Sequence, residues 1–464
     1  SDTHGWGIFG LNLVQNLMRN GPIRPLILSE PNLLEAPPDH IDELRPLIAE
    51  KRQIMKAIET QDQPVHSAQI AVLHALGVDF QHVEISDLVR GGRNIGFTFF
   101  ERGNFTAEAL DRANAYDRIL AGSTWNRDYG RAAGIRDIEF VSQGVDTSLF
   151  HPGQASGAYR DRFVIFSGGK LELRKGQDLV VAAFKIFHAR HPDALLITAW
   201  QNGWPESAAD ITASIHVKAA PKVDADENLM ITRWATDNGI PANAFIDLGW
   251  LPNRAMPAVL RDIDAAVFPN RCEGGTNLVA MESMACGVPC VLSANTGHLD
   301  IMTDDNCFAL DDQRPVTDPN GDTSMWRESQ VEQIVEQLEQ IYTDRTAARQ
   351  RGEAGAAFIG NLSPAERLAE REALMASASA HGTPVSMAMP MQLPIGAPQP
   401  LFQPARRRAD SPPRGHFHAV NREYAPMGAS RGGAACSSRC VTSGGIQLTM
   451  DSLKFGGGPK QRPR

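Results

Sequence analysis

The sequence predicts an α/β protein built from two Rossmann-like domains. Short apolar strands alternate with amphipathic helices over most of the chain, which is the pattern of parallel sheets covered by helices on both faces. The length of 464 residues suits two to three domains. In the stretch Phe268–Ser293 a buried strand, a glycine-bearing loop and a helix follow one another. Such a unit seats an anion on the first amides of its helix, so a phosphate site is expected here.

The first domain is expected over residues 1–152. Its predicted elements are helix Leu11–Arg19, strand Pro25–Ser29, helices Asp42–Gln61 and His66–Leu76, strands Phe80–Ile85 and Asn94–Phe100, helix Ala107–Ala115, strand Arg118–Ala121, helix Arg127–Ala133 and strand Ile138–Val141. No strand precedes the glycine-rich opening Ser1–Gly10, so the first strand of this domain is expected to be missing from the chain. The turn-forming residues of Ser142–Pro152 predict a linker that ends the domain.

The opening glycines support a rival interpretation. Gly5, Gly7 and Gly10 have the spacing G-x-G-x-x-G, and Glu30 follows about 20 residues later, as in a dinucleotide-binding fingerprint. An NAD-dependent oxidoreductase is therefore one alternative. The strand that should lead into such a fingerprint is absent, and tight packing of a strand against a helix would explain the glycines equally well.

Polar side chains also follow the predicted strand Asn94–Phe100. Glu101 and Arg102 would lie at the carboxyl end of a parallel strand, where open α/β sheets bind ligands. We therefore expect both residues to bind a ligand on the acceptor side of the site, the side across from the expected phosphate. An ordinary surface ion pair is the alternative.

The second domain is expected over residues 153–362. Its predicted elements are strand Phe163–Ser167, helix Leu179–Arg190, strand Ala194–Ala199, helix Asn228–Asn238, strand Phe245–Leu248, helix Met256–Asp262, strand Ala265–Phe268, helix Leu278–Ala285, strand Cys290–Ser293 and helix Gln330–Arg351. A crossover helix within residues 363–376, Pro364–Ala376, would then return to the first domain.

Charged residues bracket the expected anion seat. Glu273 lies on the loop and Glu282 just over one turn into the helix, and carboxylates accept hydrogen bonds from hydroxyl groups. A phosphate flanked by acids that hold vicinal hydroxyls describes a nucleotide-sugar. Upstream, Lys170, Arg174 and Lys175 place three cations within six residues between a strand and a helix. Fixed cations stabilise the charge that develops on a leaving diphosphate, and a solvated basic turn is the alternative.

The run EGGTNLVAMESMACGVP, which begins at Glu273, resembles the donor motif of the retaining glycosyltransferases of family 4, within glycosyl transferases group 1. Those enzymes have the GT-B fold, in which two Rossmann-like domains face each other across a cleft. Seven residues separate the two Glu in the family and eight do so here, and Gly275-Thr276 replaces the usual aromatic-Gly pair. Glu282 therefore maps onto the second Glu, and Glu273 is offset by one position.

Three other segments are similar to the family. Gly168–Gly176 resembles Gly-Arg-Leu-x-x-x-Lys-Gly, with Lys170 at the Arg and Lys175 at the Lys. Lys170 supplies a point charge where the family has a bidentate fork. Gln143–Pro152 resembles the interdomain hinge, and Asn295–Asp300 resembles a Gly-Gly-x-x-Glu turn.

The resemblance implies transfer of a sugar from a nucleotide-sugar to an acceptor hydroxyl, with retention of anomeric configuration and no cofactor besides the nucleotide-sugar co-substrate. It places Lys170 and Lys175 on the diphosphate, Glu273 on the donor sugar and Glu282 on the ribose. The other donor-binding residues it implies are Gly7, Gly169, Gly274, Gly275, Thr276 and Asn277. No Asp-x-Asp motif is apparent, so no obligatory metal is expected.

The composition of the chain limits the kinds of partner and the cellular location that are expected for it. The net charge of −9 combines +8 on residues 377–464 with −17 on the remainder, and an acidic body is a poor nucleic-acid binder. Six cysteines without a framework suggest reduced thiols and hence a cytoplasmic protein. No run reaches the length of a membrane-spanning helix, so any membrane contact is expected to be peripheral, at the inner face.

Residues 377–464 are rich in Met, Pro, Ala, Gly and Arg and are expected to be disordered. The run 406–408 is a candidate contact for anionic lipid, and Cys436, Cys440, His416 and His418 form only a weak metal-binding pattern. A second alternative for the whole chain is a nucleotide-sugar-binding protein without turnover. The base, the sugar and the acceptor, whether glycan, lipid or small molecule, stay open at this point.

Overall fold

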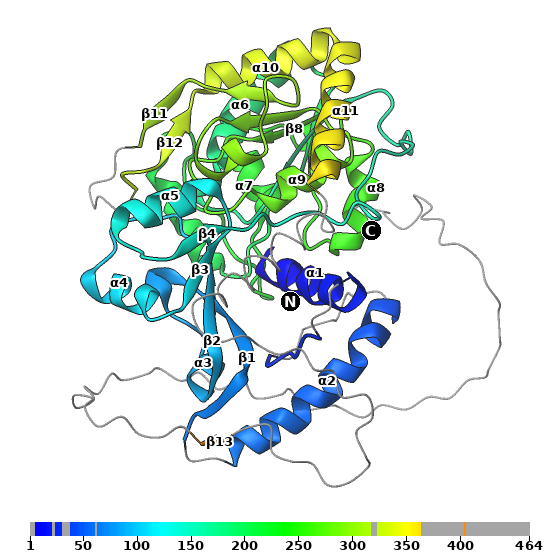
Figure 1. Ribbon diagram of the computed structural model, residues 1–464. Coiled ribbons are helices and arrows are strands. Elements are labelled where there is room, and N and C mark those ends of the chain that lie inside the picture. Colours follow the sequence, from blue (N-terminus) through cyan, green and yellow to red (C-terminus); the bar gives the residue numbers. More distant parts are fainter. Residues whose placement is uncertain are drawn as a thin grey trace, which may run out of the picture. The chain divides into compact units, whose positions relative to one another are not determined.

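Two parallel β-sheets organise the described part of the chain (Figure 1). The computed structural model describes residues 5–20, 24–29, 38–60, 63–316, 323–362 and 403–404, all within a unit that spans residues 1–406. Some predictions fall outside this part of the chain: Glu30, the crossover helix Pro364–Ala376, the tail 377–464 apart from residues 403–404, and with it the run 406–408 and the four Cys and His of the weak metal pattern.

The first sheet has the strand order β13-β1-β2-β3-β4. Strands β1 to β4 run parallel, and β13 pairs antiparallel with β1. The strands are β1 Val65–Leu76, β2 Val89–Thr98, β3 Arg118–Ala121, β4 Ile138–Phe140 and β13 Gln403–Pro404; the helices are α1 Gly5–Asn20, α2 Pro38–Glu59, α3 Ile85–Leu88, α4 Ala107–Asn114 and α5 Thr124–Ala133, with a 3₁₀ turn at Val78–Phe80. The loops after β2 and β3 therefore leave from the same edge of this sheet.

The structure corrects the prediction for β1. Residues Val65–Leu76 form a strand and not a helix. Val72, His74 and Leu76 are buried while the residues between them are exposed, which is the two-residue alternation of a strand. Apolar residues occur on both faces, so the alternation of burial does not appear as an alternation of residue type.

Three further predictions for the first region are wrong. Helix α1 begins at Gly5, so Gly5, Gly7 and Gly10 lie within a helix and not in a phosphate-binding loop. Residues 25–29 form no strand, and residues 80–85 form none either. The glycines at 5–10 therefore do not form the tight turn that gives a dinucleotide fingerprint its function.

The second sheet has the strand order β10-β9-β8-β5-β6-β7, and all its strands are parallel. The strands are β5 Phe163–Gly168, β6 Ala194–Ala199, β7 Phe245–Asp247, β8 Ala265–Phe268, β9 Cys290–Ser293 and β10 Phe308–Leu310; the helices are α6 Gln177–Arg190, α7 Ile231–Asp237, α8 Met256–Leu260, α9 Leu278–Ala285, α10 Val331–Thr343 and α11 Arg345–Asn361. Strands β11 Gln313–Pro315 and β12 Arg327–Ser329 form a separate antiparallel pair. The predicted strands of this region are confirmed.

One predicted helix of the second region is two helices. The stretch 330–351 breaks at Asp344, where α10 ends and α11 begins. The Asp344 carboxylate accepts from the Ala347 amide at 2.9 Å, which caps the first turn of α11. The cap residue was present in the sequence, but the continuous helical composition on both sides concealed the break.

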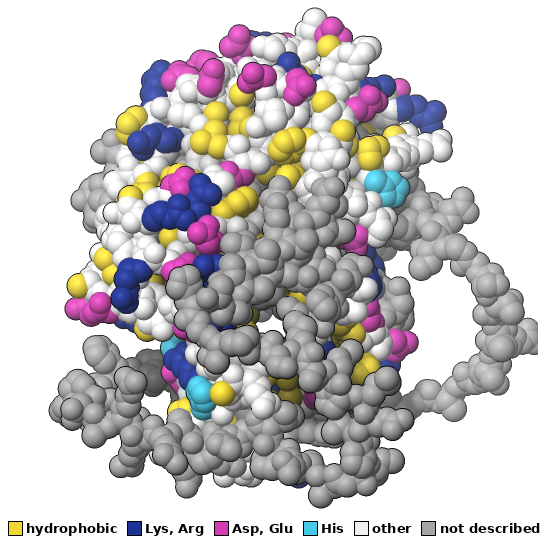
Figure 2. All heavy atoms as spheres, viewed as in Figure 1, with side chains coloured by type: hydrophobic (Ala, Val, Ile, Leu, Met, Phe, Trp, Pro, Cys, Tyr) yellow, Lys and Arg dark blue, Asp and Glu magenta, His cyan; other side chains and the backbone are white. Residues whose placement is uncertain are grey.

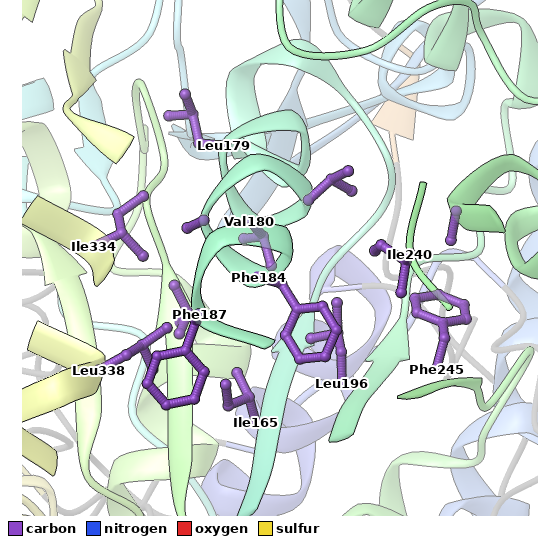
Figure 3. Close-up of a cluster of buried hydrophobic side chains, with 14 of the residues drawn as sticks. Ile165, Leu179, Val180, Phe184, Phe187, Leu196, Ile240, Phe245, Ile334 and Leu338 are labelled. Carbon is purple, nitrogen blue, oxygen red and sulfur yellow. The ribbon is translucent and has the colours of Figure 1, made fainter. Parts of the chain in front are cut away.

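Both faces of the second sheet are covered by apolar side chains. Phe163 and Ile165 of β5 join one buried cluster, whereas Val164 and Phe166 join the other, because successive strand residues point to opposite faces. Figure 3 shows the first cluster, where Phe184 and Phe187 of α6 project among side chains of the sheet and α10. Full burial of such a side chain contributes about 1.5–3 kcal/mol to folding.

The described surface carries charges of both signs. On the face drawn in Figure 2, acidic and basic side chains are interspersed over the region that holds the second sheet. Among the helices that the structure describes, none combines the length and apolar character needed to cross a membrane. The cytoplasmic location and the peripheral membrane contact stay predictions.

Candidate functional site

Two loops meet at the carboxyl ends of β5 and β8. The loop after β5 carries the predicted cations, and the loop after β8 carries the glycines. The amide of Arg271 donates to the carbonyl of Arg174 at 2.7 Å. Gly176 has φ +73°, and a Cβ there would lie 2.3 Å from the carbonyl oxygen of Pro269. The two segments singled out from the sequence therefore form one site.

Three cations and three carboxylates lie in contact at this junction, and we call them the paired-charge cluster: Lys170, Arg174, Lys175, Glu101, Glu172 and Glu273. Lys175 Nζ lies 2.5 Å from Glu273 Oε1, and Lys170 Nζ lies 2.6 Å from Glu172 Oε1. The Arg174 guanidinium lies between 3.2 and 3.5 Å from an oxygen of each of the three carboxylates. Arg174, whose direction the sequence did not fix, therefore points into the site.

The environment keeps two buried members of this cluster, Glu273 and Arg174, charged. Burial alone would raise the pKa of Glu273, but the ammonium of Lys175 and the guanidinium of Arg174 lower that pKa to about 2. Burial alone would lower the pKa of Arg174, yet the carboxylates of Glu101, Glu273 and Glu172 raise it above its ordinary value. Both groups are therefore ionised at neutral pH.

Glu101 reaches this cluster from the loop after β2 of the first sheet. Its carboxylate lies 3.5 Å from Arg174, and its carbonyl accepts from the indole N–H of Trp326 at 2.7 Å. Arg102, the next residue, is exposed. The structure thus places Glu101 beside the cations of the second region, and the acceptor-side role of Glu101 and Arg102 stays a prediction.

Arg271 fixes the shape of the two loops. Its guanidinium donates to both oxygens of Asp178 at 2.8 and 2.6 Å, to Glu328 at 2.7 Å and to the carbonyl of Leu173 at 2.5 Å. The Arg271 and Asp178 side chains are 1% and 0% exposed. Sequence reasoning missed this residue, although an arginine between a buried strand and an apolar helix was a signal that it must have internal partners.

The glycine loop after β8 packs against the first-sheet region. Ser123 Oγ donates to the carbonyl of Gly274 at 2.8 Å. A Cβ at Gly274 would lie 2.6 Å from the carbonyl oxygen of Phe100, and one at Gly275 would lie 2.7 Å from Oε1 of Gln143. Close approach to backbone therefore requires glycine at Gly274, whereas a side chain at Gly275 would have to displace Gln143, and the resemblance to a donor motif had indicated neither contact.

The last two loop residues are held by polar contacts. Oε1 of Gln143 accepts from both the amide and the hydroxyl of Thr276 at 3.1 Å. Asn277, with φ +60°, places its Nδ2 3.0 Å from Nε2 of His298, whose Nδ1 lies 3.0 Å from Ser293 Oγ. Burial lowers the pKa of His298 to about 4, although the nearby carboxylate of Glu273 has the opposite effect. His298 is therefore a neutral, hydrogen-bonded member of the site.

Glu282 lies on α9 and is 3% exposed. Its Oε1 accepts from Nδ2 of Asn253 at 2.7 Å. Burial raises the pKa of Glu282 to about 8, against the opposing effect of that hydrogen bond. At pH 7 this carboxyl group is accordingly protonated, so it has a proton to donate as well as an oxygen to accept.

Asp300 links the turn after β9 to helix α5. It accepts from the amide of Thr124 at 2.7 Å and also from the hydroxyl of that residue. Ser123, the N-cap of α5, accepts from the Asn126 amide at 3.0 Å. A carboxylate at a helix N-terminus is favoured by the helix dipole. The residue that replaces the family's Glu in this turn therefore joins the two regions.

The remaining predicted residues are placed as follows. Gly169, with φ +108°, lies beside the Lys175 side chain. Lys170 is 37% exposed and lies 5.4 Å from the ring centre of the exposed Trp204. Gly7 belongs to α1, so its predicted place in a donor-facing loop is wrong. Within the described ranges, no set of three or more His, Cys, Asp and Glu side chains is arranged to hold a metal ion.

The fold is α/β with two mainly parallel sheets, and the site joins a cationic loop to a glycine loop. Residues 153–358 match the family model of glycosyl transferases group 1. This part of the chain is therefore similar to that family, as the motifs had suggested.

Sequence relatives are similar over the same part of the chain. D-inositol 3-phosphate glycosyltransferase 1 from Catenulispora acidiphila is 29% identical over 195 residues, which are 39% of this chain and 42% of the relative. A GDP-mannose-dependent alpha-(1-6)-phosphatidylinositol monomannoside mannosyltransferase from Mycolicibacterium smegmatis is 27% identical over 175 residues, 36% of this chain and 41% of the relative. The chain thus aligns with about two fifths of the length of each.

Solved structures agree with the fold. The Anabaena protein HepE, in complex with UDP, has a TM-score of 0.52 at 14% identity and covers 81% of this chain and 96% of its own. Sucrose-phosphate synthase from Thermosynechococcus elongatus has a TM-score of 0.50 at 15% identity, with 78% and 84% coverage. At these identities the likeness concerns the fold alone, and it confirms the predicted GT-B architecture.

Proposed function

We propose that this protein is a nucleotide-sugar-dependent hexosyltransferase that retains anomeric configuration. The observation that carries the proposal is the junction of the two loops, where Arg174 and the largely buried Lys175 contact Glu273 of the glycine loop. Cations held in place at the end of a strand suit a diphosphate that gains charge as it leaves. The family match over residues 153–358 supports the same reading.

In this proposal Lys175 and Arg174 hold the diphosphate, with Lys170 at the exposed end of the cluster. The ammonium of Lys175 already contacts Glu273 at 2.5 Å, so a phosphate oxygen would share or replace that contact. Glu273 would then be available to hydroxyls of the donor sugar. Glu282, on the helix that follows the glycine loop, would hold the ribose hydroxyls.

The reaction we propose proceeds on one face of the donor sugar. The bond between the anomeric carbon and the diphosphate oxygen breaks, and the acceptor oxygen forms a new bond to the same carbon from the same side. The acceptor's proton passes to the departing phosphate oxygen, so atoms and charge balance. The cations of the cluster stabilise the diphosphate in this step, and no carboxylate is assigned as a nucleophile.

The names of the relatives guide the choice of substrates. Two relatives act, by name, on inositol 3-phosphate and on a phosphatidylinositol mannoside with GDP-mannose, and HepE was solved with UDP. We therefore propose GDP- and UDP-sugars as the first donors to test, with inositol-bearing hydroxyl compounds as acceptors. A lipid acceptor would agree with the predicted peripheral membrane contact.

The first test is a thermal-shift screen of the full chain with UDP, GDP, ADP, their sugar conjugates and NAD. We expect one nucleoside diphosphate family to stabilise the protein, and Lys175→Met to abolish that stabilisation. Lys185→Met, a change on α6 of a lysine outside the paired-charge cluster, serves as the matched control and should leave the shift intact. Stabilisation by NAD alone, insensitive to Lys175→Met, would sink the proposal.

Turnover is tested separately with the stabilising nucleotide-sugar. Release of nucleoside diphosphate in the presence of an acceptor, with the product's anomeric configuration read by NMR, would support transfer with retention. Binding of the nucleotide-sugar without product over a broad acceptor panel would favour the binding protein without turnover. An inverted product would keep the transferase class and reject the retaining mechanism.

A further inference from the structure

Glu172 occupies a position in the site that neither the motifs nor the proposed mechanism uses. It lies on the cationic loop itself, and the residue is 8% exposed. Its Oε1 is 2.6 Å from Lys170 Nζ, and its Oε2 accepts from Arg174 at 3.2 Å. The hydroxyl of Ser207 donates to Oε1 at 3.4 Å. One buried carboxylate thus contacts two of the three cations proposed to bind a diphosphate.

The charge of the site is balanced before any ligand arrives. The paired-charge cluster holds three cations and three carboxylates, so its net charge is zero when all six are ionised. Burial alone would raise the pKa of Glu172, but Arg174 and Lys170 lower that pKa below its ordinary value. Glu172 therefore keeps its negative charge at neutral pH.

The substrate and the product of the proposed reaction differ in charge. In a nucleotide-sugar the terminal phosphate is esterified to the sugar, whereas the released nucleoside diphosphate has an additional ionisable oxygen. A site with unbalanced cations would therefore bind the product more tightly than the donor, and product release limits many enzymes. A fixed carboxylate beside the cations opposes this preference.

We propose that Glu172 is a positioning residue that acts through Lys170 and Arg174 and weakens the binding of the nucleoside diphosphate product. This inference rests on the proposed function. It assigns to Glu172 an effect opposite in sign to that of the cations: the chain binds the product less tightly with this carboxylate than without it.

The geometry distinguishes Glu172 from the other two carboxylates. Glu101 is contributed by the first-sheet region, and its side chain is 31% exposed. Glu273 also accepts from Asn270 and lies on the glycine loop, where the donor sugar is proposed to bind. Glu172 belongs to the same loop as all three cations, and its contacts are to Lys170, Arg174 and a hydroxyl. Removal of the Glu172 carboxylate therefore changes the charge where the diphosphate is proposed to bind. It disturbs the proposed sugar-binding residues less than removal of Glu273 would.

The test is calorimetric titration of the wild-type chain and Glu172→Gln with whichever of UDP, GDP or ADP stabilises the wild type, and with the matching nucleotide-sugar. We expect Glu172→Gln to bind the nucleoside diphosphate on the order of tenfold more tightly, the effect of one unit charge at a partly buried site. The gain for the nucleotide-sugar should be smaller. In a turnover assay the same variant should show stronger product inhibition and a lower kcat.

Controls separate charge from packing. Glu172→Asp keeps the charge and should bind the diphosphate within about twofold of the wild type if charge is the cause. Glu339→Gln removes a carboxylate that pairs with Arg190, the last residue of α6, and with His191, which follows it. This variant should leave nucleotide binding unchanged. If Glu172→Gln does not fold, as judged by its circular dichroism and thermal transition, Glu172→Ala is titrated in its place with the same expectation.

The outcomes are distinguishable. Weaker or unchanged binding of the diphosphate by the neutral variant would mean that Glu172 merely holds Arg174 in place, and the inference would be overturned while the proposed function stands. Equal tightening by Glu172→Asp would also overturn it, because the charge would then not be the cause. Absence of any nucleoside diphosphate binding by the wild type would reject the proposed function and this inference together.

Discussion

The two sheet regions use the same βα unit but place their charges differently. In the second region the ionic groups at the two loops are buried, as in the Arg271–Asp178 pair, whose side chains are 1% and 0% exposed. In the first region the ion pairs lie at the surface, as in Arg118–Asp137, with side chains 14% and 43% exposed. Aromatic rings such as Phe100 pack the interior there instead. The chain thus surrounds the charges at the two loops with polar partners, whereas the Arg118–Asp137 pair is partly exposed to water.

Among the variants that test this contrast, Arg271→Met is expected to have the largest effect. The change would leave Asp178 buried without its partner and remove the bond to the Leu173 carbonyl, so we expect a loss of about 3–5 kcal/mol in the free energy of unfolding. Arg118→Met should cost about 1 kcal/mol or less. Urea denaturation of both variants measures the difference, and equal losses would break the comparison.

The next effect is a pH dependence that depends on Glu282. Its pKa is raised by burial from 4.5 to about 8 in the folded state, so between these values the folded chain holds a proton that the unfolded chain has released. Its contribution to stability should therefore fall by about 1 kcal/mol per pH unit as the pH rises through this window.

Glu282→Gln isolates that contribution. The free energies of unfolding of wild type and variant, measured at pH 5, 6, 7 and 8, should diverge progressively, with the variant gaining relative stability as the pH rises. His298 and Glu273 titrate in both proteins and so largely cancel from the difference. Parallel curves would show that Glu282 is ionised throughout and that its surroundings are wetter than the contacts indicate.

A smaller effect is expected where the two regions touch. Trp326→Phe keeps an aromatic ring but leaves the carbonyl of Glu101 without its indole donor, at a cost of about 1–2 kcal/mol. Trp250→Phe removes a similar bond to Asn228 from a side chain that is 45% exposed, and should cost about 0.5 kcal/mol or less. Thermal unfolding of the two variants, compared with the wild type, tests whether the contact between regions contributes to stability.

The smallest effect concerns Asp300. Asp300→Asn keeps an acceptor for Thr124 but removes the charge at the N-terminus of α5, so we expect a loss of about 0.5 kcal/mol. Asp300→Ala removes the acceptor too and should cost about 1 kcal/mol. Hydrogen exchange of the amides in the first turn of α5 should rise in the same order. If exchange is unaffected in both, the carboxylate does not cap this helix in solution.

The second region was predictable from sequence because its strands are buried on both faces. Runs such as Phe163–Phe166 and Ala265–Phe268 are apolar throughout and are separated by helices of ordinary length, so each βα unit stands out. The site motif was predictable for a related reason, since a helix N-terminus after a buried strand requires particular loop residues. Lys175 and Glu273 were singled out in this way, and the structure brings them together.

The first region was less predictable because its signals depend on distant partners. The glycines at 5–10 matched a fingerprint by spacing, but that fingerprint functions only after a strand, and here the glycines lie in a helix. Strand β1 alternates in burial and not in residue type. Arg174 contacts Glu101, and Asp300 contacts Thr124, so each contact joins the two sheet regions. No local sequence pattern encodes such pairs.

Gly297 limits the conformational freedom of the glycine loop. A Cβ at this position would lie 1.6 Å from the carbonyl oxygen of Gly275, and the Gly297 amide donates to the backbone carbonyl of Glu273 at 3.1 Å. The loop is thus enclosed by backbone on one side and by Phe100 on the other, so it has few alternative conformations. Association with a rigid loop loses little conformational entropy, which favours affinity without additional contacts. For an anion that binds here, most of the ordering is already complete when the chain has folded.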